Sequence, residues 1–178
     1  MTASLSASPA SGAYKADINF TGSGFAANET VNVYSSGVGS AVLASATADG
    51  SGSFTAAAQV PQSPFGYRLF VGVGQSSGKL GAASFSISPR LLLNPTSGLG
   101  GSTVTAQAVG FGSFEQVKIY WTPTKSLLGT VTANVYGTVT GGAALSFTVP
   151  SGAPSGANKL QAVGQTTNAT AQATFTVQ

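Results

Sequence analysis

Apolar and polar residues alternate in short runs along this chain. Ile18-Asn19-Phe20, Val31-Asn32-Val33 and Phe175-Thr176-Val177 are three examples. A period of two places one face of a β-strand on a core and the other face toward water. No segment carries an apolar stripe with a period of about 3.6 residues over the length of a helix. The pattern therefore predicts an all-β protein.

Turn-forming residues, such as Asp49-Gly50-Ser51-Gly52, separate these runs at intervals of roughly 8–12 residues. In the first half of the chain, the expected strands are 3–7, 16–22, 30–35, 41–47, 53–60, 66–74 and 81–87. In the second half, they are 90–94, 103–109, 116–122, 127–135, 143–149, 157–164 and 170–177. About seven strands in each half match the immunoglobulin-like sandwich. We therefore expect two tandem immunoglobulin-like β-sandwich domains.

The two halves repeat one unit. At an offset of 86 positions, residues 8–34 share eight identities with the second half, at Pro9, Ser11, Gly12, Gly24, Phe25, Glu29, Val31 and Tyr34. Later segments align at an offset of 89 or 90, where Val60-Pro61 meets Val149-Pro150 and Gly74-Gln75 meets Gly164-Gln165. The expected domains are residues 1–88 and 89–178. The short join at Ser88-Pro89-Arg90 limits how far they can swing.

The order of these repeated residues resembles the immunoglobulin-like repeats of bacterial extracellular and cell-wall proteins, in particular the IPT/TIG-like kind. In the first half, the matching residues are Pro9, Ser11, Gly12, Gly24, Phe25, Glu29, Val31, Val60, Pro61 and Phe85. In the second half, they are Pro95, Ser97, Gly98, Gly110, Phe111, Glu115, Val117, Val149, Pro150 and Phe175. The resemblance implies spacers, stalks or adhesive modules, and this transfer of function is an analogy.

The composition excludes most enzyme chemistry. Charged residues make up 6% of the 178 residues, against about 25% in an average protein. The chain has no Cys and no His, which removes the thiolate nucleophile, the commonest general base and the usual zinc ligands. Its acids are Asp17, Glu29, Asp49 and Glu115, too few and too spread out for a typical pair of catalytic carboxylates. We expect no enzymatic activity, no cofactor and no metal.

Seven basic residues against four acids give a net charge of +3. The basic residues are scattered along the sequence, at Lys15, Arg68, Lys79, Arg90, Lys118, Lys125 and Lys159. Nucleic-acid binding needs a basic stripe, and membrane-surface binding needs a polybasic run or an amphipathic helix. The longest aliphatic run, Leu91-Leu92-Leu93, is far shorter than the roughly 20 residues that span a bilayer. We expect no nucleic-acid binding and no membrane insertion.

Glu29 and Glu115 occupy equivalent positions in the two halves. One interpretation is a repeated Ca²⁺ or ligand contact. The other is a carboxylate that accepts hydrogen bonds from backbone N–H groups in the loop before the third strand. Ca²⁺ takes about six to eight oxygen ligands, usually from several carboxylates. Because Asp17 and Asp49 have no acidic counterparts in the second half, the structural interpretation is favoured.

The aromatic residues offer two kinds of candidate. Trp121 shares its strand face with Val117 and Ile119, which favours a place in the core over a sugar-stacking role. Tyr34 and Tyr120 lie in the opposite phase to their apolar strand neighbours, so both should face outward. Two equivalent outward tyrosines can form a repeated contact, or they can take part in ordinary cross-strand packing.

The strand 66–74 is apolar on both faces. The repeat sets Phe70 against Leu160, a core position, so Tyr67, Leu69, Val71 and Val73 should face outward. An exposed apolar stripe marks an interaction surface. The competing interpretation is a one-residue slip of strand phase at a bulge.

These observations predict a non-enzymatic structural or interaction module of a bacterial surface or secreted protein. It would be a spacer, adhesin or fibre-forming unit that contacts protein neighbours or copies of itself. The alternative is a carbohydrate-binding module that uses exposed aromatics on surface glycans. Residues 1–6 lack the basic and apolar regions of a signal peptide. The composition, rich in Ser, Thr, Gly and Ala and poor in Lys and Glu, nevertheless favours an extracellular or cell-surface location with the signal removed.

Overall fold

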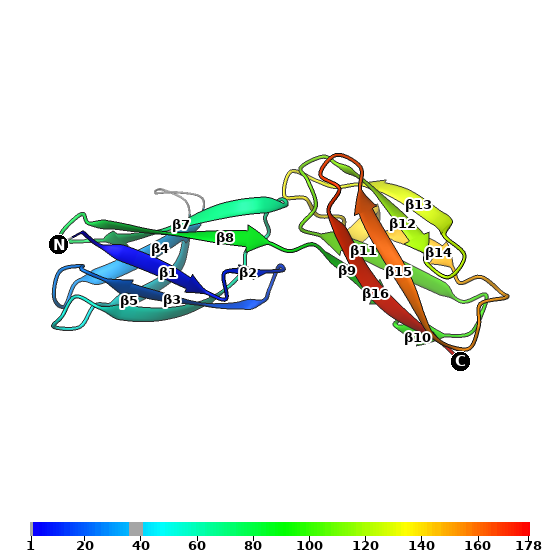
Figure 1. Ribbon diagram of the computed structural model, residues 1–178, viewed down its shortest axis with the longest axis horizontal. Helices are drawn as coiled ribbons and strands as arrows, with labels where there is room; N and C mark the ends of the chain where they lie inside the picture. Colours follow the sequence, from blue (N-terminus) through cyan, green and yellow to red (C-terminus); the bar gives the residue numbers. More distant parts are fainter. Residues whose placement is uncertain (1, 36–40) are drawn as a thin grey trace. The chain divides into compact units, whose positions relative to one another are not determined.

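The computed structural model describes residues 2–35 and 41–178, and the chain is all-β with two immunoglobulin-like sandwich units (Figure 1). One compact unit comprises Met1–Pro61 and Gly66–Ile87, and the other comprises Gln62–Phe65 and Ser88–Gln178. In each unit a three-stranded sheet packs against a five-stranded sheet around its own hydrophobic core. Within the described residues, no helix has the length and apolarity needed to cross a bilayer.

The first unit has a three-stranded sheet in the order β1-β3-β6 and a five-stranded sheet in the order β2-β8-β7-β4-β5. The strands of the smaller sheet are β1 (Ser4–Ser8), β3 (Asp17–Ser23) and β6 (Phe54–Gln59). Those of the larger sheet are β2 (Ser11–Gly12), β4 (Thr30–Ser35), β5 (Val42–Thr47), β7 (Gly66–Gly74) and β8 (Leu80–Ile87). Neighbouring strands are antiparallel except for β2 and β8, which are parallel.

The second unit repeats this topology, with sheets in the orders β14-β11-β9 and β10-β16-β15-β12-β13. The smaller sheet contains β9 (Arg90–Asn94), β11 (Thr103–Val109) and β14 (Leu145–Thr148). The larger sheet contains β10 (Ser97–Gly98), β12 (Gln116–Trp121), β13 (Ser126–Thr132), β15 (Gly156–Gly164) and β16 (Thr170–Val177). A 3₁₀ turn, η1 (Gly141–Ala143), precedes β14.

A strand forms at each of the fourteen places where alternation predicts one. The largest differences lie between β13 and β14, where the predicted strands are too long. β13 ends at Thr132 because Asn134 builds a turn, its Oδ1 accepting the backbone N–H groups of Tyr136 at 2.9 Å and Thr138 at 3.1 Å. Strands β2 and β10 are not predicted by the sequence pattern, because two residues are too few to show alternation.

The two cores place their aromatic volume differently. In the first unit, the Phe70 ring meets Phe20 and Phe85 edge to face, with centroids 5.1 and 5.5 Å apart. In the second unit, Trp121 is fully buried with its ring centroid 6.5 Å from that of Phe175. The core interpretations of Trp121 and Phe70 are therefore confirmed, and Trp121 is not available for sugar stacking.

Candidate binding surfaces

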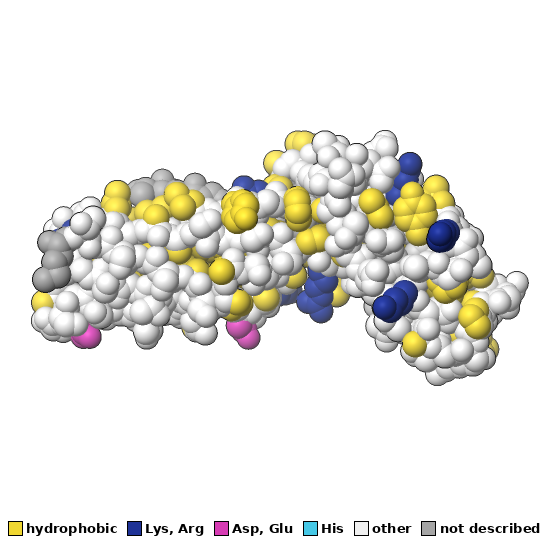
Figure 2. Space-filling model, viewed as in Figure 1, with side chains coloured by type: hydrophobic (Ala, Val, Ile, Leu, Met, Phe, Trp, Pro, Cys, Tyr) yellow, Lys and Arg dark blue, Asp and Glu magenta, His cyan; other side chains and the backbone are white. Residues whose placement is uncertain are grey.

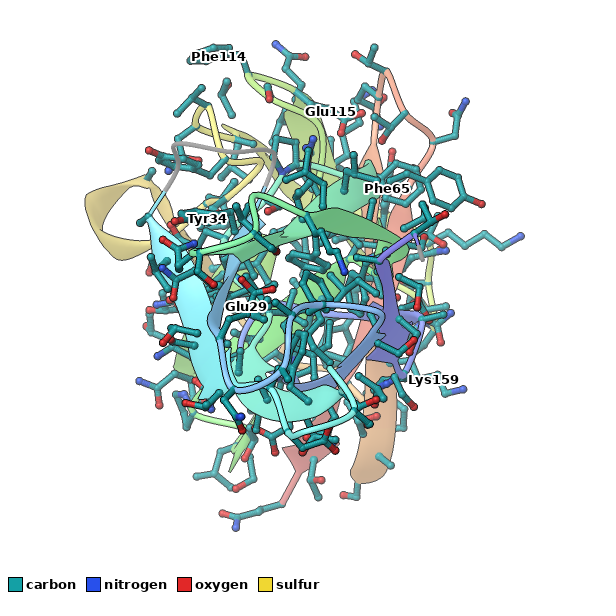
Figure 3. The ribbon with its side chains drawn as sticks, turned by 90° about the vertical axis from the view of Figure 1, so that its left-hand side faces the viewer. Glu29, Tyr34, Phe65, Phe114, Glu115 and Lys159 are labelled. Atoms are coloured by element: carbon teal, nitrogen blue, oxygen red, sulfur yellow. The ribbon has the colours of Figure 1, made fainter. Side chains whose placement is uncertain are left out.

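Glu29 ties two loops of the first unit together (labelled with Glu115 in Figure 3). Its Oε1 accepts hydrogen bonds from the Ala26 N–H at 2.6 Å and from Ser77 Oγ at 2.7 Å. Its Oε2 accepts the N–H groups of Ser76 and Ser77 at 3.1 and 2.9 Å, and also Ser76 Oγ at 2.9 Å. Because these donors come from the loops before β4 and after β7, the carboxylate fastens one end of the larger sheet.

Hydrogen bonding keeps the Glu29 carboxyl ionised. Burial by itself would raise the pKa of this group. The donors from Ala26, Ser77 and Ser76 outweigh burial and lower the pKa from 4.5 to about 2. The folded loops therefore hold this carboxyl in its charged form.

Glu115 makes the equivalent cradle in the second unit. Its Oε2 accepts the Gly112 N–H at 2.6 Å, and its Oε1 accepts those of Thr166 and Thr167 at 2.7 and 2.6 Å. The Thr167 hydroxyl lies 3.0 Å from both oxygens. Burial by itself would raise the pKa of this carboxyl. The hydrogen bonds outweigh burial and hold the pKa below its usual value. The backbone hydrogen-bond interpretation of both glutamates is thus confirmed.

Each glutamate rests against a glycine that the repeat also aligns. A Cβ on Gly74 would collide with the Glu29 carboxylate, and one on Gly164 would lie 2.6 Å from both oxygens of Glu115. The glycine of each repeated Gly-Gln pair therefore leaves the space that the glutamate carboxylate occupies. Both signals are present in the sequence, but the strand pattern does not connect them.

The outer face of the first unit's larger sheet carries several exposed apolar side chains, which pair in register with Asn32, Ser84 and Ser86 among others. Tyr67 is 78% exposed and Leu69 51% exposed, and Val73 is half-buried beside them on β7. Leu80 of β8 and Val42 of β5, both more than half exposed, extend this face. We call these residues, together with Tyr34 and Val71, the apolar face.

Val71 corrects the sequence-based expectation of an exposed stripe. Its side chain lies on the outer side of β7, because the adjacent Phe70 fills the core, yet only 8% of its surface is exposed. It pairs in register with Tyr34 on one side and Ala82 on the other, and cross-strand neighbours shield the middle of a sheet. The pairing of β7 with β8 runs without a register shift, so the phase-slip interpretation is wrong for this strand.

Tyr34 and Tyr120 are equivalent, but their neighbours differ. Each is half-buried and follows a register shift on the edge-strand side, between Val33 and Tyr34 in β4 and between Ile119 and Tyr120 in β12. Across the sheet, Tyr34 pairs with Val71, whereas Tyr120 pairs with Gln161. Of the two equivalent tyrosines, Tyr34 therefore lies beside an apolar side chain and Tyr120 beside a polar one.

A pocket of about 270 Å³ surrounds Tyr120. It is lined by Tyr120, Thr122, Lys125, Gln161 and Val163. Lys118 and Lys159 stand on the same face of β12 and β15, since they alternate with buried residues in phase with Tyr120 and Gln161. Three lysines that are scattered in the sequence are thus gathered by the fold, which sequence analysis missed.

Another pocket, of about 340 Å³, lies in the first unit and is lined by Thr21, Thr47, Asp49, Ser53, Phe54 and Thr55. The carboxylate of Asp49, which lines this pocket, is already hydrogen-bonded within its own turn. Asp49 Oδ1 accepts the Ser51 and Ser53 N–H groups at 2.8 and 3.0 Å and the Ser51 hydroxyl at 2.6 Å. The hydroxyl and these N–H groups lower the pKa of Asp49, and the group serves the turn. Among the described residues, no three His, Cys, Asp or Glu side chains gather where they could hold a metal ion.

Two exposed loop aromatics of the second unit were also missed. Phe114 is 69% exposed, and Tyr136 is about half exposed. Phe114 has a φ of 55°, where the equivalent Asn28 has 60°. Strand alternation carries no information about loop side chains, so neither residue had a signal in the pattern.

Comparisons with known proteins agree with the fold. Residues 2–87 match the macroglobulin-like domain family, which supports an immunoglobulin-like sandwich and not the IPT/TIG kind in particular. No curated protein matches the chain in sequence.

Three solved structures illustrate the likeness. They are invasin, a bacterial integrin-binding protein (12% identity, TM-score 0.42, covering 100% of this chain), InvD of Yersinia pseudotuberculosis (16%, 0.37, 98%) and the BSP domain of a biofilm associated protein (18%, 0.35, 89%). This chain covers 40%, 57% and 27% of those chains, respectively. What the surfaces of this chain bind must be argued from their own residues.

Proposed function

We propose that this chain is a non-enzymatic interaction module of a bacterial surface or secreted protein, and that residues 1–88 and 89–178 are its two domains. It works through the outer faces of its larger sheets, as a spacer, adhesin or fibre-forming unit outside the cell. The observation that carries the proposal is the apolar face of the first unit.

The repeat shows that this face is not a requirement of the fold. At an offset of 90, the second unit carries polar side chains at three of the apolar positions, while Val73 is matched by Val163. Leu69, Val71 and Leu80 correspond to Lys159, Gln161 and Thr170. Since the same sheet folds with a polar surface, the apolar residues serve a purpose other than folding, and exposed apolar patches mark interaction sites.

A second copy of this chain is the partner that fits this face best. The five strands contain 2, 8, 9, 6 and 6 residues, and at about 4.8 Å between strands and about 3.3 Å per residue they cover about 500 Å². That area is below the roughly 800 Å² per partner of a standard interface, so we expect weak, concentration-dependent pairing. Three basic and three acidic residues cancel in the first unit, so two copies repel each other little. A two-fold pairing would place each apolar face on its equivalent.

The test is sedimentation velocity over a range of concentrations. Leu69→Lys and Leu80→Thr together give the first unit the side chains of the second at these places. We expect the wild type to dimerise and the double variant to weaken dimerisation at least tenfold with an unchanged circular dichroism spectrum. Thr174→Lys, at an exposed position of β16, adds the same charge elsewhere and should leave pairing unchanged. A wild type that stays monomeric at millimolar concentration, or a folded double variant that pairs as well as the wild type, would refute pairing through this face.

A further inference from the structure

We propose that the pocket around Tyr120 binds an acidic saccharide. This inference concerns the second unit and does not depend on pairing through the apolar face. It combines an aromatic ring, an amide, a hydroxyl without a partner and three cations on one sheet face.

The pairing of β12 with β15 assembles the pocket. Lys118 pairs with Val163, and Tyr120 pairs with Gln161. One step further, the Thr122 N–H donates to the Lys159 carbonyl at 2.9 Å. Two strands that are about forty residues apart in sequence thus bring two lysines to the flanks of Tyr120. Lys125 joins them from the turn between β12 and β13.

The lining suits a sugar ring. Apolar ring faces such as that of Tyr120 pack against the C–H face of a sugar, and a few polar groups around an apolar floor set orientation in small-ligand sites. Gln161 offers two amide donors and a carbonyl acceptor. At about 270 Å³ the pocket lies just below the roughly 300–1,000 Å³ range of drug-sized ligand pockets, which suits a single sugar ring of a longer chain.

Thr122 supplies an independent observation. Its Oγ1 is buried and has no hydrogen-bond partner among the described residues. Buried hydroxyls are nearly always hydrogen-bonded, so one without a partner at the edge of a pocket requires an explanation. Because this oxygen is closed to solvent in the empty pocket, a rotation of the Thr122 side chain about χ1 is needed before a ligand hydroxyl can supply the missing bond.

The charge distribution selects an acidic ligand. The second unit has Arg90, Lys118, Lys125 and Lys159 against one acid, Glu115, so it carries the whole net charge of +3. Glu115 is 3% exposed and its oxygens are occupied by N–H and hydroxyl donors, so it offers no screening at the surface. In Figure 2, dark-blue Lys and Arg side chains lie around hydrophobic side chains on the visible face of the second unit, and the magenta carboxylates in view lie on the first. A sugar carboxylate or sulfate would complement these cations.

The first unit provides a matched control. At the positions equivalent to Lys118, Gln161 and Lys159, it has Asn32, Val71 and Leu69. Tyr34 therefore stands among neutral and apolar side chains, and we expect no affinity for an acidic sugar there.

The test uses the full chain and isothermal titration calorimetry. The probes are tetragalacturonate, its neutral methyl ester and a sulfated tetrasaccharide from heparin, which separate carboxylate from sulfate recognition. We expect binding of at least one acidic probe, at least tenfold weaker binding of the methyl ester, and weaker binding at high salt. Tyr120→Ala and Lys125→Gln should reduce affinity about tenfold and threefold, respectively, while Tyr34→Ala should have no effect.

Because Tyr120 is half-buried, its variant needs a folding control. Trp121 is the only Trp of the chain, so its fluorescence reports on the second unit. Gln161→Val, which inserts the residue of the first unit, provides a conservative variant and should also weaken binding. No binding of either acidic probe at millimolar concentration would overturn the proposal. So would an unchanged affinity in folded Tyr120→Ala and Gln161→Val, or tighter binding of an oligothymidylate that displaces the sugar.

Discussion

The two larger sheets of this chain have the same topology, but their outer surfaces differ in chemistry, one carrying apolar residues and the other polar and basic residues. In one, a tyrosine after the register shift stands beside Val71 and an uncharged apolar face. In the other, its equivalent stands beside Gln161 and is flanked by lysines. Both units contain the same hydrogen-bonded cradle around a glutamate carboxylate, with a glycine packed against it. The features shared by both units are those that the fold requires. The outer side chains of the larger sheets differ between the units and can therefore serve binding.

The cores differ in a compensating manner. Phe70 pairs across the sheet with Ser35, and Leu160 pairs with Trp121 at the equivalent place. A large residue on one strand thus accompanies a smaller one on the neighbouring strand. Phe20 of the first unit corresponds to Ala106 of the second, which leaves further room for the indole. Packing at native density requires that total volume be conserved, but not which strand supplies it.

The largest expected effect is the loss of Trp121. Trp121→Ala should destabilise the second unit by about 3–5 kcal/mol, because it empties the centre of that core. Ser35→Ala, at the equivalent place in the first unit, should change stability by less than about 0.5 kcal/mol. Urea unfolding followed by far-ultraviolet circular dichroism measures both.

A double variant sharpens this comparison. Trp121→Ser with Leu160→Phe moves the aromatic ring to the strand that carries it in the first unit. We expect it to be more stable than the sum of the two single changes predicts, since paired core residues couple. If the stability changes of the two single variants simply add up in the double variant, the two units do not fill their cores by moving the aromatic ring from one strand to its neighbour.

A smaller effect is expected when the two cradles are neutralised. Glu115→Gln should cost the second unit about 1–3 kcal/mol at pH 7, because buried N–H donors lose a charged acceptor. Glu29→Gln should lower the melting temperature of the first unit without moving the Trp121 fluorescence transition. A shift of that transition in Glu29→Gln would contradict two independently folding domains.

The cradles also predict how stability depends on pH. The pKa of Glu29 is about 2 in the folded chain and near 4.5 when unfolded, so between these values the unfolded chain binds more protons. Its stabilisation is complete above about pH 4.5 and is lost as the pH falls toward 2. We expect the wild type to melt at a lower temperature at pH 3 than at pH 7, and Glu29→Gln to show a smaller difference in the first transition. An equal loss in both proteins would exclude this carboxylate as the cause.

The sequence was informative where one strand or one repeat carries the signal. Alternation predicts the strands, and the aligned Glu29 and Glu115 already favour backbone hydrogen bonds. It was silent where the property depends on cross-strand neighbours. The burial of Val71 requires the positions of β4 and β8, and the gathering of Lys118 and Lys159 requires the register of β12 with β15. Periodicity along one strand contains none of this information.

The smallest expected effect concerns a charge that the second unit does without. Asp49 accepts N–H groups two and four residues ahead, and Asn134 accepts N–H groups at the same two spacings with its neutral amide oxygen. Since the amide does the same work, Asp49→Asn should change the melting temperature by no more than about 2 °C, whereas Asp49→Ala, which removes the acceptor, should lower it further. The pKa of Asp49 is lowered by the Ser51 hydroxyl and the N–H groups of Ser53 and Ser51, so any benefit of the charge should be largest at pH 7 and decline in acid. Thermal melts of the three proteins at pH 7 and pH 3 test this. If Asp49→Asn is as damaging at pH 7 as Asp49→Ala, the charge itself holds the turn, and the two turns are not equivalent.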